Sequence, residues 1–199
     1  MSFQTITTKR LVFGVNSHVV NGTVLVDTGF NAASADKIIS EMEKQGSDPS
    51  GLELCIITHR HTDHVGGLRA IKERLGVEVA AHRLEAEAIE KATGVGVDRR
   101  LEDGDVIPLA GGIKVVHLPG HTEGNIGLLV GRNLITGDTV FENRGRLTPP
   151  PSYFSSDPGK ARESILRLRD LEVESIYPSH GNPIHEGAAE IIESMIAAL

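Results

Sequence analysis

The segment from His59 to His64 constrains this chain more than any other, because it places three histidines and an aspartate within six residues. The uninterrupted apolar run Leu54–Ile57 before it predicts a buried strand, and apolar residues at helical spacing follow it. His59 and His61 point to the same side of an extended segment, and a helical turn after them would bring Asp63 and His64 to the same hollow. Packing these groups together without a cation is costly, so the spacing predicts a metal site.

Two other interpretations of this segment are weaker. A histidine-rich surface loop would leave unexplained the ligand-type residues that recur farther along the chain. A nucleophile paired with a base would need a serine or cysteine among these groups, and the segment has neither. The single cysteine, Cys55, lies in the apolar run and is predicted to be a core residue.

Three more ligand-type residues, His121, Asp138 and His180, each follow a segment with the pattern of a strand. Five neutral imidazoles and two carboxylates suit zinc, with iron or manganese as alternatives. Seven ligands are too many for one tetrahedral ion, and two ions need a shared ligand, which a carboxylate can be and an imidazole cannot. The sequence therefore predicts two divalent metal ions, Zn²⁺ in the first place, bridged by an aspartate.

Other polar residues near predicted strand ends have weaker claims on the site. Asp27 follows the predicted strand 23–26 and either forms a simple turn or braces a metal-binding histidine, as such histidines usually require. His82 is better explained as a residue at a helix start, His117 as a packed strand residue and His185 as a surface residue.

The apolar periodicity divides the chain into short strands and amphipathic helices. The predicted strands cover residues 11–15, 18–20, 23–26, 54–57, 77–81, 113–118, 126–130, 134–136 and 176–177, and the predicted helices cover residues 34–45, 68–75, 84–92, 157–170 and 186–199. Residues 141–156 show no periodicity and contain three consecutive prolines, so we expect a loop stiffened by polyproline geometry beside the site.

Length and composition indicate a soluble globular protein rather than a nucleic-acid-binding or membrane protein. The 199 residues are predicted to form a single domain, 1–199, and 39% hydrophobic with 24% charged residues is typical of soluble globular proteins. The apolar runs are too short to span a membrane and the N-terminus lacks a signal-peptide pattern, so a cytoplasmic location is predicted. The net charge of -7 and the lack of a basic stripe argue against nucleic acid as a partner. We expect a small-molecule substrate, and no pattern predicts an oligomeric state.

The chain resembles the metallo-β-lactamase superfamily, and the motifs that carry the resemblance occur in the family's order over most of the sequence. They are Val26–Gly29, Thr58–His64, Gly120–Thr122, Gly137–Asp138 and Ser179–Gly181. The resemblance implies an α/β fold of four layers, an αβ/βα sandwich of two mixed β-sheets flanked by helices, with the site at one edge.

The resemblance also implies a role for each ligand-type residue. His59, His61 and His121 would hold the first metal, Asp63, His64 and His180 the second, and Asp138 would bridge the two. Asp63 is in addition the expected catalytic residue, Asp27 is expected to support a ligand without binding metal, and Tyr153 would touch the substrate as a tyrosine does in lactonases.

Within the superfamily, the pattern resembles the glyoxalase II-like hydrolases, the lactonases and related thioester or phosphoester enzymes. A hydroxide shared by two metals would attack an ester-type bond, a thioester, lactone or phosphoester. Class B lactamases generally lack an aspartate equivalent to Asp138 and are exported, nuclease branches add clamp domains, and glyoxalase II adds a C-terminal glutathione-binding domain that is not expected here. Glu123 stands where such relatives often have proline. The alternative is an iron persulfide dioxygenase, which uses the first metal's ligands alone.

Overall fold

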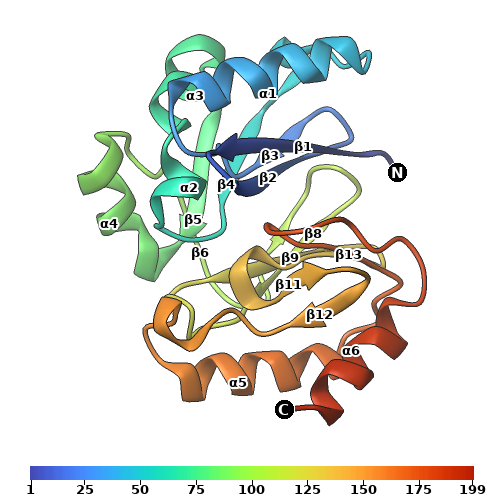
Figure 1. The fold of residues 1–199 in the computed structure, drawn as a ribbon. Coiled ribbons are helices and arrows are strands. Elements are labelled where there is room, and N and C mark those ends of the chain that lie inside the picture. Colours follow the sequence, from blue (N-terminus) through green and yellow to red (C-terminus); the bar gives the residue numbers. More distant parts are fainter.

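The computed structural model describes residues 1–199 and stacks four layers, helices, sheet, sheet and helices, from top to bottom in Figure 1. The first sheet has the strand order β1-β2-β3-β4-β5-β6, and the second has the order β13-β10-β9-β8-β7. The strands of the first sheet are β1 (Phe3–Arg10), β2 (Phe13–Val20), β3 (Val24–Val26), β4 (Leu54–Ile57), β5 (Glu78–His82) and β6 (Arg99–Leu101). Those of the second are β7 (Val106–Ile107), β8 (Ile113–His117), β9 (Ile126–Val130), β10 (Asn133–Ile135) and β13 (Ser175–Tyr177).

The longer helices lie on the two outer faces of this sandwich (Figure 1). They are α1 (Ala32–Lys44), α3 (Leu68–Leu75), α4 (Arg83–Thr93), α5 (Pro158–Arg167) and α6 (Ala188–Ala197). The short helix α2 (Thr62–Val65) follows β4 and carries part of the histidine motif. Apolar residues of α1, α3 and α4 share one buried cluster with the first sheet, and those of α5 and α6 share another with the second sheet. The side of each sheet that faces away from its partner is thus covered by helices, as the αβ/βα prediction requires.

Strand periodicity places a third cluster between the sheets. Successive side chains of a strand point to opposite faces, so Leu25 and Cys55 pack on the helices while Val24 and Leu54 pack against the second sheet. Both faces of β3 and β4 are therefore buried, which explains why these strands are continuous apolar runs.

The carboxyl ends of the parallel strands bring the site to one edge of the sandwich. β3, β4 and β5 run parallel in the first sheet, and β10 runs parallel to β13 in the second. The segments that leave β4, β10 and β13 carry the histidine motif, Asp138 and His180 respectively. Parallel strands end at a common edge, so residues far apart in sequence meet there.

Three details of the predicted secondary structure are wrong. Leu11 and Val12 form the turn of a hairpin rather than a strand, and the strand β1 that precedes them is absent from the prediction. The expected loop 141–156 contains a second hairpin of β11 (Phe141–Asn143) and β12 (Arg146–Thr148). The edge strand β6 is likewise absent from the prediction. The predicted strand Leu54–Ile57 and helix Leu68–Leu75 are confirmed with the same bounds.

Each helix of the structure is too short, or too polar, to cross a lipid bilayer.

Candidate metal centre

The structure brings all seven predicted ligands together in three overlapping groups, in each of which the ligand atoms lie within 4.8 Å of one another. The groups are His59 with His61 and His121, His59 with His64 and Asp138, and Asp63 with His64 and His180. The chain thus assembles one polar cluster from four segments, and each segment follows a strand.

The first group is a triangle of imidazole nitrogens. His61 Nδ1 lies 3.1 Å from His59 Nε2 and 2.9 Å from His121 Nε2. Two nitrogens bound to one tetrahedral zinc at 2.0–2.1 Å are about 3.3 Å apart. Three ring nitrogens that converge at this spacing fit a shared cation.

Asp63, His64 and His180, called the second group from here on, join α2 to the loop after β13. Asp63 Oδ2 lies 3.7 Å from His64 Nε2 and 3.5 Å from His180 Nε2. On its other side, the ring of His180 is fixed because Nδ1 donates a hydrogen bond to the carbonyl oxygen of Gly14 at 2.7 Å. This bond orients Nε2 toward the site, as ligating histidines require.

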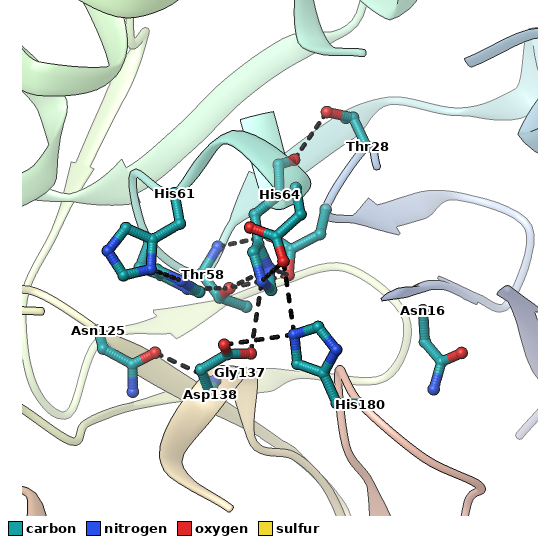
Figure 2. Close-up of polar contacts among 12 residues, drawn as sticks. Asn16, Thr28, Thr58, His61, His64, Asn125, Gly137, Asp138 and His180 are labelled. Atoms are coloured by element: carbon teal, nitrogen blue, oxygen red, sulfur yellow. Dashed lines mark hydrogen bonds and ion pairs between the residues drawn. The ribbon is translucent and has the colours of Figure 1, made fainter. Parts of the chain in front are cut away.

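Asp138 lies between the two groups. Its Oδ2 is 3.3 Å from His121 Nε2 and 3.4 Å from His180 Nε2, and its Oδ1 is 3.4 Å from His64 Nε2. Figure 2 shows the carboxylate pointing up between the rings of His64 and His180. One side chain thus contacts ligand atoms of both groups, the position expected of a bridging carboxylate.

The donor set fits a bound cation for a further reason. His64 Nε2 and Asp138 Oδ1 are buried and have no hydrogen-bond partner. Buried polar atoms are otherwise almost always paired, so these two mark a place where a partner is required. A divalent cation would satisfy both.

Burial and charge set the protonation of the two groups differently. Burial lowers the pKa of His59 well below its usual value and that of His121 to about 4, so both rings are neutral, as metal ligands must be. Burial also opposes protonation of His64 and His180, but nearby carboxylates outweigh it. Asp27 and Asp138 raise the pKa of His64 well above its usual value, and Asp138 and Asp63 raise the pKa of His180 to about 9. The second group therefore attracts positive charge, which a metal could supply in place of a proton.

Asp27 holds the histidine motif from behind, as predicted for a supporting residue. It is 1% exposed, and its Oδ1 and Oδ2 accept hydrogen bonds from the backbone N–H and hydroxyl of Thr58, each at 2.8 Å. Asp27 Oδ2 also lies 2.7 Å from His64 Nδ1, which turns Nε2 of that ring toward the cluster. Asp27 has a φ of +59°, which is uncommon for a residue other than glycine. The strained backbone is tolerated where the carboxylate is needed.

A second buried carboxylate, Glu85, holds the site and is absent from the sequence-based prediction. It is fully buried in the first turn of α4. Its oxygens accept hydrogen bonds from the backbone N–H of Arg60 at 2.8 Å, from Arg60 Nη1 at 2.9 Å and from the backbone N–H of Gly124 at 2.8 Å. In sequence, a glutamate near a helix start indicates only a favourable interaction with the helix dipole, so only the fold reveals these contacts.

The remaining candidate residues lie outside the three groups. Tyr153 is 80% exposed and packs against Phe154, and no contact joins it to the ligands. His82 is the N-cap of α4 and stacks on His117 with ring centroids 4.1 Å apart. Glu123 is exposed and, with Gly120 and Thr122, lines a cavity of about 370 Å³.

A comparison with known protein families matches the part of the chain that carries these residues. A family model described as the metallo-beta-lactamase superfamily matches residues 10–180, a span that contains all seven candidate ligands. The chain belongs to this superfamily. Among its curated relatives are a probable metallo-hydrolase, YflN of Bacillus subtilis, with 30% identity over 81% of this chain and 76% of that protein, and a hydroxyacylglutathione hydrolase of Chelativorans sp., with 34% identity over 79% of this chain and 57% of that protein.

Solved structures of the superfamily share the fold. A metallo-beta-lactamase from Pontibacter korlensis superposes with a TM-score of 0.76 at 21% identity, over 98% of this chain and 92% of that one. A metallo-beta-lactamase family protein from Thermus thermophilus gives 0.74 at 20% identity, over 98% and 78%. The relatives named as hydrolases support a hydrolase, and the histidine and aspartate groups are suited to divalent metals.

Proposed function

We propose that this chain is a hydrolase that uses two divalent metal ions, Zn²⁺ in the first place, to cleave an ester-type bond of a small molecule. The observation that carries the proposal is the position of Asp138, whose two oxygens contact ligand nitrogens of both groups. A thioester, a lactone and a phosphoester are the candidate bonds. The relative named hydroxyacylglutathione hydrolase favours a thioester, and this chain covers just over half of that protein.

The chain's own side chains divide the remaining work. Two metals, when bound, supply Lewis acidity and lower the pKa of shared water toward neutrality. Asp63 is more exposed than Asp138, the other carboxylate of the cluster, with side-chain exposures of 25% and 5%. Its Oδ2 is the oxygen that faces His64 and His180. Its Oδ1 is therefore free to accept a proton from the attacking water and to return it to the leaving atom. The imidazoles and Asp138 hold the two halves of the site at fixed separation.

Metal analysis combined with an activity panel tests this proposal. Protein purified without added metal should hold about two equivalents of zinc, and should hydrolyse at least one of a thioester, a lactone and a phosphodiester while leaving a β-lactam intact. A chelator should abolish the activity, and zinc should restore it. A single iron with oxygen consumption on a persulfide would replace the proposal with the dioxygenase alternative, which the intact second group of ligands argues against.

An apolar hairpin tip beside the site suggests which substrates fit best. Leu11 and Val12 form the turn between β1 and β2 and are 91% and 88% exposed, and Phe13 after them is 66% exposed. Gly14, next along the chain, accepts the hydrogen bond of His180. Leu11 has a φ of +57°, whereas the φ of Val12 is not positive, as in a type II′ turn. The first position of such a turn favours glycine, so the backbone of Leu11 is strained. Apolar residues at a strained and solvated turn favour contact with an apolar part of the substrate.

The double variant Leu11→Gly with Val12→Asn tests this contact. Glycine followed by asparagine suits a type II′ turn, so the midpoint temperature of thermal unfolding should stay unchanged or rise. The Michaelis constant for a substrate with a long acyl chain should increase about tenfold, the effect of losing roughly 1.4 kcal/mol of apolar contact. Hydrolysis of the matching acetyl substrate is the control and should be unchanged. An equal effect on both substrates would exclude an acyl-binding role for the tip.

A further inference from the structure

Besides Asp138, two buried carboxylates bind the segments that carry the candidate ligands, and they contact different segments. Asp27 contacts Thr58 and His64, at the start of the histidine motif and in α2. Glu85 contacts Arg60 and Gly124. The two residues are 1% and 0% exposed, so neither is a surface charge placed by chance.

The contacts of Glu85 join the two loops that carry the whole first group of ligands. Arg60 stands between His59 and His61, and its backbone N–H points to Glu85 Oε2 at 2.8 Å. Gly124 stands three residues after His121, and its backbone N–H points to Glu85 Oε1 at 2.8 Å. One backbone bond joins the two segments nearby, from Ile126 N–H to the carbonyl oxygen of Thr58 at 3.2 Å, and Ser156 N–H donates to the carbonyl oxygen of His121 at 3.0 Å. Glu85 is the side chain that ties the residue between His59 and His61 to the end of the His121 loop, and it therefore helps to set how far His121 lies from the other two imidazoles.

The charge of Glu85 matters because all three of its polar neighbours are donors. Besides the two backbone N–H groups, Arg60 Nη1 donates to Oε1 at 2.9 Å. A carboxylate can accept all three bonds, whereas a glutamine has one accepting oxygen and would turn its amide N–H₂ toward at least one donor. A buried donor without a partner forces its loop to move.

The loop around Gly124 also fits Glu85 closely. A Cβ added to Gly124 would lie 2.8 Å from Glu85 Cγ and 2.9 Å from His82 Nδ1. The absence of a side chain at position 124 thus lets the backbone reach the carboxylate. A methyl group there would push the two apart without changing any charge.

We infer that Glu85 is a positioning residue for the metal held by His59, His61 and His121, and that it acts through the backbone of Arg60 and Gly124. The inference rests on the proposed function only in requiring a metal at these ligands. The second group, Asp63, His64 and His180, lies on α2 and on the loop after β13, which Glu85 does not contact. Loss of Glu85 should therefore affect one of two metals.

Stepwise zinc titration of the metal-free variant Glu85→Gln tests the inference. Competition against a chromophoric chelator should show one of the two binding steps weakened about 10- to 100-fold, the usual effect of removing a residue that orients ligands, and the other changed less than about threefold. The Co²⁺-loaded variant should show an altered d–d absorption spectrum at one equivalent. Both readouts need no substrate, so they remain informative if the hydrolase assignment fails.

Two further variants separate positioning from simple structural damage. Glu87→Gln removes the same charge from an exposed position on the same helix and should leave both steps unchanged. Gly124→Ala should weaken the same step as Glu85→Gln, which keeps the test open if Glu85→Gln fails to fold. Equal weakening of both steps, or a Gly124→Ala variant with wild-type affinities, would overturn the inference.

Discussion

The turnover number of the Asp63→Asn variant should fall by a factor of about 10²–10⁴, the usual contribution of a general acid–base group. The variant should retain most of its metal. Asparagine keeps an oxygen that can contact the second group, at the position where Asp63 Oδ2 now lies 3.5 Å from His180 Nε2. It cannot accept and return a proton. Turnover and metal content measured on the same preparation, at saturating zinc, separate the two roles.

The His180→Ala variant provides the comparison. It removes a candidate ligand without changing the proton-transfer group, so its activity should follow zinc occupancy and recover as zinc is added. Asp63→Asn saturated with zinc should stay slow. If activity and metal content instead fall together in both variants, Asp63 has no separate proton role.

The sequence predicts the fold best where local pattern and tertiary environment agree. The run Leu54–Ile57 is apolar throughout because both of its faces are covered, and its bounds are those predicted. Asp157 and Pro158 mark the start of α5, because a side-chain cap and a fixed φ favour a helix start in any context.

The prediction fails where tertiary contacts override local pattern. Strand β1 alternates polar threonines with few apolar residues and lies at the sheet edge, so its pairing with β2 leaves a weak sequence signal. Leu11 and Val12 resemble strand residues because they are apolar, yet they form an exposed turn. Arg144 and Gly145 in the turn between β11 and β12 both have positive φ, as in a type I′ hairpin, and Gly145 is the residue of this pair that signals such a turn in the sequence.

The candidate ligands can be picked out from the sequence because metal binding restricts residue type and spacing, and the supporting residues are harder to find. Asp27 is predictable as a support for a ligand because it follows a strand in a family motif. Glu85 lies 25 residues from Arg60 and 39 from Gly124, and its role depends on two loops that meet only in the folded protein. Hydrogen bonds to backbone N–H groups impose no residue type on the donor, so they leave no pattern in the sequence.

The Gly66→Ala variant should lose about 3 kcal/mol or more of its free energy of unfolding, the range of severe overpacking. Gly66 ends α2 with helical φ and ψ of -62° and -29°, so an alanine is not strained by its own backbone. The obstacle is space, because its Cβ would lie 2.0 Å from the carbonyl oxygen of Phe30. Backbone cannot yield as a flexible side chain does, so α2 and the segment after β3 must separate.

That separation should also affect the metal centre, which makes the variant informative beyond stability. The same close approach lets the backbone N–H and hydroxyl of Thr28 both donate to the carbonyl oxygen of His64 at 2.8 Å, beside the contact between Asp27 and His64. Urea unfolding of the metal-free protein should show the lower free energy of unfolding, and zinc titration should show weaker binding at the second group.

Gly96→Ala is the control, because a Cβ there meets nothing within 4 Å and the φ of Gly96 is not positive. Its free energy of unfolding should rise by about 0.4–1 kcal/mol. A Gly66→Ala variant as stable as Gly96→Ala would show that α2 does not need this close approach, and that the glycines after the histidine motif serve another purpose.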